Sequence, residues 1–421
     1  MRHVVVIGAG AAGTMAAIFA ARGGARTTLL ERTRDGGRKI LISGGGRCNV
    51  LPLVVDESRF ITDSSPNTLR KILRSWPLDE QVHFFEQEIG IPLVEERESL
   101  KRFPASHKAR DVRDGLLAHA RQCSVDIRFD TQVTGFSATA AGWRVDIASG
   151  APLDADAVIV ATGGLSVPAT GSDGLGLRVL REMGHAMHRT YAALTPLTSS
   201  DATLAALSGV SLTVSLTARD TARSASATGG FLFTHHGYSG PSVLDVSHVV
   251  VRSRHEGDGS AKVTVRWTDL DEAAWNDALR SQGVRTVAGA VRAQLPDRLA
   301  MALIERAAVD PSRTLSELRR DERMRLVEML VSGPLPWSGD EGYKKAEVTG
   351  GGVSLAEVDP RTMESRRNPA LFLCGELLDA FGPIGGYNFF WAWTTGRAAG
   401  RGAAGQEQPS THSTNGRSPM R

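Results

Sequence analysis

The sequence has very few cysteines, and no two of them stand close together. Cys48, Cys123 and Cys374 are the three in 421 residues, and none forms the Cys-x-x-Cys spacing of a redox or metal motif. An odd, scattered set does not build a disulfide framework, so we expect a protein of the reducing cytoplasm. No metal site is predicted.

Long apolar runs and an excess of one charge are also missing. No segment reaches about 18 uninterrupted apolar residues, so no membrane span is expected. The apolar start of the chain is broken by glycines and predicts a strand entering a helix, not a signal peptide. The 49 basic residues nearly balance the 46 acidic ones. We therefore expect a small-molecule substrate and no nucleic acid partner; the oligomeric state is left open.

The chain is long enough for more than one domain. At 421 residues, with 41% hydrophobic and 23% charged residues, it has the composition of a globular protein with two or three domains. A β-branched run at Val4–Ile7, a small-residue helix at Ala11–Arg22 and a strand at Thr27–Leu30 form a βαβ unit. This unit predicts an α/β fold with a parallel sheet.

A glycine-rich turn joins the first strand to the first helix. Gly8 allows the tight turn, Gly10 lets the backbone approach a pyrophosphate, and Gly13 lets the helix pack closely on the sheet. Glu31 follows about 20 residues later, where a carboxylate accepts the ribose hydroxyls of an adenosine. The motif predicts a Rossmann-type dinucleotide site; its residues are Gly8, Ala9, Gly10, Ala11, Ala12 and Gly13.

The motif alone does not distinguish NAD from FAD, but two later segments favour FAD. Ala161, Thr162 and Gly163 end another apolar strand, where a tight turn can touch the nucleotide again. Far downstream, Gly375 and Glu376 follow a last strand, and Gly386 opens a helix. A carboxylate there can bind ribityl hydroxyls, and a helix N-terminus can stabilise the anion of a reduced flavin.

Several further segments resemble one family of bacterial NAD(P)/FAD-dependent oxidoreductases, which includes an aminoacetone oxidase and a reductase of unsaturated 3-oxo bile acids. They occur in the family's order from Val4 to about Gly400. The chain departs from the family at Val50-Leu51-Pro52, where a Thr-Asn pair is usual. The matching segments are Gly37–Asn49, Arg102–Ala109, Leu232–Pro241, Glu347–Val353, Gly375–Asp379 and Gly385–Trp393.

The resemblance implies a discontinuous Rossmann-type FAD domain with an inserted β-barrel and a small helical domain. From the residues alone, the alternating pattern between about His188 and Asp269 predicts an antiparallel sheet or a small barrel. The expected boundaries are 1–189 and 345–402 for the FAD domain, 190–270 and 334–344 for the barrel, 271–333 for the helices and 403–421 for a disordered tail.

The resemblance also implies which residues surround FAD, bound without a covalent link. Around the phosphates and adenosine it places the Gly8–Gly13 motif, Glu31 and the backbone of Val133. The segments between and beyond them add Arg32, Arg38, Lys39, Gly44, Gly45, Arg47, Ala161, Thr162, Gly163, Gly375, Glu376, Asp379, Gly386, Asn388 and Phe389.

The catalytic residues stay unknown from the sequence. Arg47 or Lys39 could offset charge on a reduced flavin, or simply bind phosphate or a surface carboxylate. Cys48 could be a redox thiol, or an inert buried cysteine. His235 and Tyr238 lie with His236 in a glycine-containing loop, where a proton donor could sit, although a histidine in such a loop is more often structural or solvated.

The leading functional hypothesis is two-electron redox chemistry on an amine or an unsaturated carbonyl, as an oxidase or a reductase. The chain has one nucleotide fingerprint, so NAD(P)H, if used, would bind transiently in the substrate cleft. The alternative is a flavoprotein whose FAD is structural or redox-sensing and which binds RNA or a protein partner.

Overall fold

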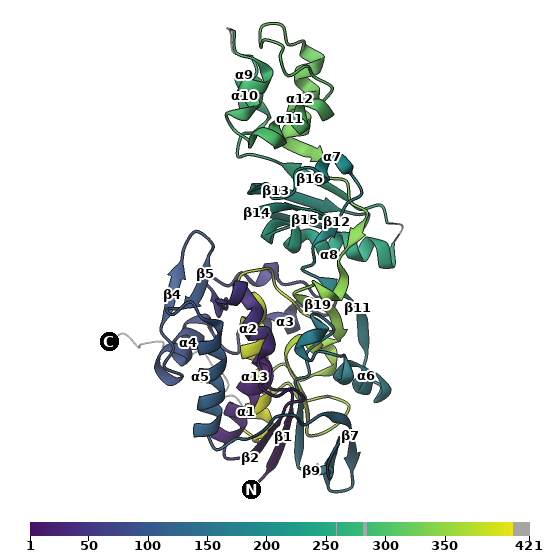
Figure 1. The fold of residues 1–421 in the computed structure, drawn as a ribbon. Coiled ribbons are helices and arrows are strands. Elements are labelled where there is room, and N and C mark those ends of the chain that lie inside the picture. Colours follow the sequence, from purple (N-terminus) through teal and green to yellow (C-terminus); the bar gives the residue numbers. More distant parts are fainter. Residues whose placement is uncertain (258, 281–283, 407–421) are drawn as a thin grey trace, which may run out of the picture.

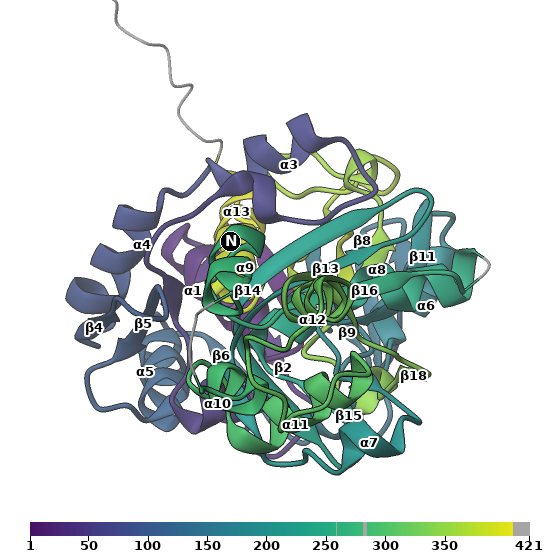
Figure 2. The same cartoon turned by 90° about the horizontal axis from the view of Figure 1, so that it is seen from above.

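A computed structural model describes residues 1–257, 259–280 and 284–406. Figure 1 shows three parts stacked along one long axis: a large lower part that holds the N-terminus, a middle part built on a sheet, and a helical part at the far end. The view along that axis places the helical part over the others rather than beside them (Figure 2).

A five-stranded parallel sheet is the centre of the lower part. Its strand order is β20-β10-β1-β2-β6, so β20, from the C-terminal end of the chain, lies beside β10. Val5 of β1 pairs with Val158 of β10 on one side and Thr28 of β2 on the other. The strands are β1 (His3–Ile7), β2 (Arg26–Leu30), β6 (Asp126–Arg128), β10 (Ala157–Val160) and β20 (Leu371–Leu373).

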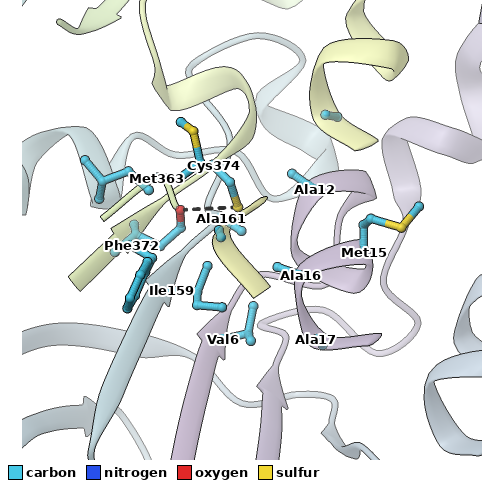
Figure 3. Close-up of a cluster of buried hydrophobic side chains, with 14 of the residues drawn as sticks. Val6, Ala12, Met15, Ala16, Ala17, Ile159, Ala161, Met363, Phe372 and Cys374 are labelled. Carbon is cyan, nitrogen blue, oxygen red and sulfur yellow. Dashed lines mark hydrogen bonds between the residues drawn. The ribbon is translucent and has the colours of Figure 1, made fainter. Parts of the chain in front are cut away.

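The first and last helices, α1 (Ala11–Arg22) and α13 (Tyr387–Ala403), pack against each other at very short range. A Cβ atom on Gly396 would lie 2.4 Å from the carbonyl oxygen of Ala12, and one on Gly400 would lie 2.3 Å from that of Ala16. Only glycine allows this approach. Figure 3 shows Ala12 and Ala16 beside the strand side chains of the same apolar cluster. The two helices therefore share one core although they are far apart in the sequence.

The rest of the lower part surrounds this centre. The sequence over Leu69–Gly90 has a helical pattern, but the helix is split because the chain turns at Trp76-Pro77. The pieces are α3 (Pro66–Leu73), α4 (Leu78–His83) and the π-helical η3 (Phe84–Glu88), followed by β4 (Leu93–Glu96), β5 (Lys101–Pro104) and α5 (Ala109–Gln122). The glycine-rich composition of Arg38–Asn49 predicts a loop, but the segment contains α2 (Arg38–Ile42) and the 3-10 turn η1 (Ser43–Gly46).

One short strand pairs with a different sheet from the one that follows it in the chain. From the sequence, Ile127–Phe129 predicts the start of an antiparallel meander, but Ile127 lies in β6, the edge strand of the parallel sheet. The meander itself is β7 (Val133–Thr139), β8 (Gly142–Ile147) and β9 (Leu153–Ala155). A three-residue strand carries too little pattern to reveal its neighbour.

The middle part is a seven-stranded antiparallel sheet in the order β17-β16-β13-β14-β15-β12-β18. Within the described residues its edge strands β17 and β18 share no ladder, so this is an open sheet rather than the closed barrel implied by the resemblance. Its strands are β12 (Leu197–Thr198), β13 (Ser211–Arg219), β14 (Ser224–Thr234), β15 (Gly237–Ser239), β16 (Lys262–Arg266), β17 (Gly333–Pro334) and β18 (Gly339–Asp340).

A long helix, α8 (Pro241–Glu256), packs on this sheet and was missed from the sequence. Its run Val249-Val250-Val251 is β-branched and favours a strand on local preference. All three valines are buried, so packing decided the conformation. Two strands, β11 (Met187–Ala193) and β19 (Val348–Val353), form a separate antiparallel pair between the lower and middle parts.

The helices at the far end are α9 (Glu272–Ala278), α10 (Val287–Arg292), α11 (Asp297–Arg306) and α12 (Arg320–Ser332). They share one hydrophobic cluster with the middle sheet, in which Trp275 and Leu326 join Phe231. The domain boundaries themselves stay a prediction. Of the expected tail, residues 403–406 complete α13 and its final turn, and 407–421 lie outside the described residues.

No helix among the described residues is long and apolar enough to cross a membrane. Nor do the described residues bring together three histidine, cysteine or acidic side chains that could hold a metal ion.

Candidate functional site

A long cavity of about 510 Å³ runs along the carboxyl ends of the parallel strands, within the size range of ligand sites. One end is formed by Glu31, Arg32 and Val133. The other is formed by Glu347, Phe381 and the residues that precede α13. Between them lie residues from both ends of the chain: Gly8, Gly10, Ala11, Ala12, Arg38, Lys39, Gly44, Ala161, Thr162, Gly163, Gly375 and Glu376.

The glycine turn before α1 leaves an open space in the middle of the cavity. Gly8 has a φ of +104°, and a Cβ atom there would meet the carbonyl oxygen of Ala161 at 2.6 Å. A Cβ on Gly13 would lie 1.8 Å from the oxygen of Gly8, whereas one on Gly10 would meet nothing within 4 Å. The space beside Gly10 faces the first turn of α1, whose N–H groups have no partner within the helix. A pyrophosphate fits this place.

Glu31 is fixed at the adenosine end by the backbone around it. Its Oε2 accepts a hydrogen bond from the N–H of Ala9 at 2.8 Å. Its Oε1 accepts from the N–H of Thr33 at 2.8 Å and from its hydroxyl at 2.7 Å. A carboxylate has about four acceptor positions, so one is left for a ribose hydroxyl. This arrangement fits the predicted role.

Two buried polar atoms along the cavity have no partner. Oδ1 of Asn49 and Oγ1 of Thr162 are buried and make no hydrogen bond within the described residues, and both residues line the cavity. Leaving such an atom unpaired costs about 1–3 kcal/mol. A ligand with phosphates and a chain of hydroxyls supplies the missing hydrogen-bond partners, so these two unpaired atoms fit FAD.

Glu376 lies at the centre of a polar network rather than free in the cavity. Its carboxylate pairs with Lys39, accepts from Ser166, and accepts from the N–H and hydroxyl of Thr349 at 3.0 and 2.9 Å. Lys39 also donates to Ser166 at 2.6 Å. The two residues predicted on opposite ends of the chain are therefore brought together, and each holds the other in place.

The N-terminus of α13 opens onto the far half of the cavity. Gly386 has a φ of +93°, and a Cβ there would lie 2.5 Å from the backbone of Leu51. Asn388 closes the preceding loop, because its amide bonds both the N–H and the carbonyl of Gly382 at 2.9 Å. Phe389 stacks on Trp393 at 5.3 Å. The positive end of the helix is thus held in place at the cavity wall.

The segment Val50-Leu51-Pro52, where the chain departs from the family pattern, helps to hold α13 in place. Leu51–Pro52 is strand β3, buried and paired with β5. The indole N–H of Trp393 donates to the carbonyl oxygen of Val50 at 3.0 Å. The segment carries backbone contacts that hold α13, and its side chains do not line the cavity.

Two carboxyl groups at the far end have raised pKa values. Burial raises the pKa of Glu347, although the charges of Lys101 and Lys39 act against it. Burial also raises the pKa of Asp245, on α8, to about 6. Asp245 accepts a hydrogen bond from the N–H of Ile384 at 2.8 Å and faces Arg59 at 3.7 Å. Middle and lower parts of the molecule meet at this point.

Several residues that the sequence placed near the cofactor do not line the cavity. Asp379 is 2% exposed, and its Oδ2 accepts from Thr62 at 2.9 Å and from the N–H of Ser64 at 2.9 Å. Arg47 pairs with Glu96 at 3.0 Å and lies over the ring of Phe103 at 4.1 Å. Gly45 also lies outside the lining, and Ala9 and Gly13 act through packing and backbone contacts instead.

The weaker catalytic candidates also lie elsewhere. The Tyr238 hydroxyl is committed to the carbonyl oxygen of Pro336 at 2.7 Å, and the side chain is 1% exposed. His235 and His236 are exposed in the turn between β14 and β15. Cys48 is fully buried, and burial raises the pKa of its thiol to about 12, as in an inert core cysteine.

The residues that sequence reasoning missed are Glu347, Asp245 and Lys101. Glu347 stood inside a recognised segment, but nothing in its spacing marked it as facing the cavity. Asp245 sits in the unrecognised helix α8, on the turn that meets the Ile384 loop. Only the packing of α8 on the lower part reveals it.

Known proteins resemble this chain over almost its whole length. Residues 2–402 match a family described as HI0933-like protein Rossmann domain. A ribosomal RNA dihydrouridine synthase of Escherichia coli is 30% identical over 93% of this chain and 95% of its own length. A 3-dehydro-bile acid delta(4,6)-reductase of Clostridium scindens is 33% identical over 96% of this chain and 99% of its own.

Among solved structures, a 3-ketosteroid delta1-dehydrogenase from Sterolibacterium denitrificans superposes with a TM-score of 0.54 at 11% identity. The match covers 96% of this chain and all of that one. At this identity the likeness concerns the fold alone.

Proposed function

Because the chain belongs to the HI0933-like family of Rossmann-type flavoprotein oxidoreductases, we propose that it is an FAD-dependent reductase of carbon–carbon double bonds conjugated to a carbonyl group. The observation that carries the proposal is the cavity, which offers a dinucleotide site at one end and an apolar wall with a free acid at the other.

The cofactor in this proposal is FAD held without a covalent bond. The open space beside Gly10, the carboxylate of Glu31 and the unpartnered oxygens of Asn49 and Thr162 support it. No histidine lines the cavity among the described residues, and the one cysteine that does, Cys374, is fully buried with a raised pKa. Neither residue type is therefore offered for a covalent link.

The reaction class follows from what the two named relatives have in common. A 3-dehydro bile acid with a delta(4) bond is an enone, and the reducible double bond of a uracil is also conjugated to a carbonyl. Both reductions add hydride to the β carbon and a proton to the α carbon. Of the substrates that the sequence left open, an unsaturated carbonyl is therefore favoured over an amine.

The far wall of the cavity suits such a substrate. Phe381, Ile384 and Val348 line it, and Ile42 adds an apolar side chain that is 54% exposed. NAD(P)H is the proposed electron source, binding transiently at this same end, because the chain has one nucleotide fingerprint.

The test is anaerobic reduction of the purified yellow protein with NADH or NADPH, followed by mixing with 2-cyclohexen-1-one. Rapid return of the oxidised flavin spectrum and formation of cyclohexanone would support the proposal. A protein that takes up no FAD on reconstitution, or whose reduced form reacts with oxygen alone, would contradict it.

Reduction of a uracil in ribosomal RNA is the second candidate. Two relatives carry that name, and Lys344 and Lys345 are exposed cations on the cavity lining, placed to meet phosphates. The near-neutral charge of the chain is therefore no argument against RNA. In the same assay, reoxidation by a uridine-containing RNA but not by the enone would select this candidate. RNA binding without reoxidation would favour a structural or redox-sensing FAD.

A further inference from the structure

The cavity is lined by four acidic side chains, and three of them are already paired. Glu31 accepts three hydrogen bonds from Ala9 and Thr33. Asp173 pairs with Arg32 and accepts from the N–H of Leu175. The third, Glu376, belongs to the network with Lys39 described above. The fourth is Glu347.

Glu347 combines a fixed backbone with a free side chain. Its N–H donates to the carbonyl oxygen of Leu194 at 3.1 Å, and its own carbonyl oxygen accepts from the hydroxyl of Ser166 at 3.2 Å. Its carboxyl group makes no hydrogen bond or ion pair with any described residue. Glu347 is an exposed residue, and its side chain lies on the wall of the cavity.

The neighbours of Glu347 place it at the flavin-ring end. Val348, the next residue, belongs to a small apolar cluster with Phe381. Ile384 packs against that cluster and directly precedes the glycines that begin α13. Glu347 therefore faces the space between the N-terminus of α13 and the apolar wall, where the proposed substrate would lie.

Building on the proposed function, we propose that Glu347 is the catalytic acid that protonates the α carbon of the substrate. When FAD is bound and reduced, it supplies hydride to the β carbon, having received it from NAD(P)H. The π electrons of the C=C bond then form an enolate. The O–H bond of Glu347 breaks, its proton joins the α carbon, and the carboxylate regains a proton from solvent.

Other proton sources in the cavity are poorer. Within the described residues, no tyrosine or histidine lines it. The lysines that do are Lys39, which is paired with Glu376, and the exposed Lys344 and Lys345. An exposed ammonium is a weaker acid than a carboxylic acid by about six powers of ten. The raised pKa of Glu347 keeps more of it protonated near neutrality, as a general acid requires.

The charged groups around Glu347 come from several elements. Lys101 on β5 and Lys39 on α2 favour its ionised form, and Asp245 on α8 disfavours it. A filled cavity removes water from the side chain and shifts the balance further toward the protonated acid.

The experiment compares wild type, Glu347→Gln and a matched control, Glu341→Gln, which changes a glutamate of the same segment outside the cavity lining. The reduced holoenzyme is mixed with 2-cyclohexen-1-one over a range of pH. Glu347→Gln should slow reoxidation by about 100-fold or more, while FAD content and reduction by NAD(P)H stay unchanged. Wild-type reoxidation should decline at high pH, and the variant should be flat. Glu341→Gln should match wild type.

Two readouts do not depend on turnover. The affinity for cyclohexanone, followed by the flavin spectrum, should change less than threefold in Glu347→Gln. The infrared band of a protonated carboxyl group in the apoprotein, followed through a pH titration, should disappear at a lower pH in Glu347→Gln than in wild type, whereas Glu341→Gln should match wild type.

The outcomes separate the two proposals. A wild-type enzyme that reduces the enone while Glu347→Gln does so at the same rate overturns the role of Glu347 alone. Reduced wild type that reacts with neither the enone nor a uridine-containing RNA overturns the proposed function, and the inference with it.

Discussion

The two ends of the cavity are built on opposite principles. At the proposed adenosine end, the carboxylates of Glu31 and Asp173 are held in place by hydrogen bonds and an ion pair from the protein. At the far end, Glu347 has no partner among the described residues, and Asp245 keeps a raised pKa against the Ile384 loop. The carboxylates of the first end therefore have fixed positions, whereas the carboxyl group of Glu347 at the second end is unpaired. A binding group can be held by protein partners, whereas a reactive group must be free to change its protonation state.

The largest effect should come from the packed glycine of the first end. Gly13→Val should abolish folding, because even its Cβ would lie 1.8 Å from the oxygen of Gly8. The expected loss exceeds about 4 kcal/mol and should appear as insoluble protein or loss of cooperative unfolding. Gly10→Ala is the matched control, since its φ is −80° and its Cβ meets nothing within 4 Å. Its apoprotein should unfold like wild type but bind FAD at least about tenfold more weakly. Normal FAD affinity in that control would remove the pyrophosphate from this place.

Glu31→Ala should come next. It leaves the buried N–H of Ala9 unpaired and removes the ribose acceptor, for a loss of about 2–3 kcal/mol, or roughly 100-fold in FAD affinity. Gel filtration should strip most of the yellow colour. Glu31→Gln keeps one acceptor oxygen and should fall between the two. Full retention of flavin by Glu31→Ala would mean that the adenosine end is not where the comparison puts it.

A pH-dependent effect should mark the far end. The pKa of Asp245 is raised from 3.8 to about 6 in the folded protein, so folding favours the protonated form. Its contribution is fully present below pH 4 and is lost as the pH rises through 6. Asp245→Asn should therefore be up to about 3 kcal/mol more stable than wild type at pH 8, and no more stable near pH 4. Thermal unfolding at both pH values tests this, and an equal gain at both would refute the titration.

The smallest effect should come from Arg47, which lies outside both ends. Its ion pair with Glu96 is exposed, and its guanidinium group covers the ring of the buried Phe103 in a cation–π contact. Arg47→Ala should cost about 1 kcal/mol of stability and leave flavin affinity and spectrum within about twofold. A large change in the flavin spectrum would show that Arg47 contacts the flavin, and would contradict its position outside the cavity.

The first end was largely predictable because its chemistry is local. A strand, three spaced glycines, a helix and an acid about 20 residues later each have their own pattern, and the parallel sheet brings them into register. The last strand and α13 were also predicted, from an apolar run followed by glycines. Asp379 belongs to a segment that resembles a binding motif, but it does not line the cavity, and its carboxylate accepts from Thr62 and Ser64.

The second end of the cavity was not predictable, because its residues come together only through contacts between distant segments. The segment before β19 and the Ile384 loop line it, with Asp245 of α8 bonded to that loop from behind, and none of these segments has a pattern that predicts its neighbours. The helix α8 itself was hidden, because its valines favour a strand until the antiparallel sheet buries them.

The sequence by itself determined the glycine turn before α1 and the carboxylate of Glu31 that bonds to it, since short-range backbone geometry suffices for that. Only the tertiary structure decided which acidic side chains are held in ion pairs and which remain unpaired in the cavity. The pKa and the partners of a side chain depend on segments that come together through packing, and the sequence of one segment does not predict which others will pack against it.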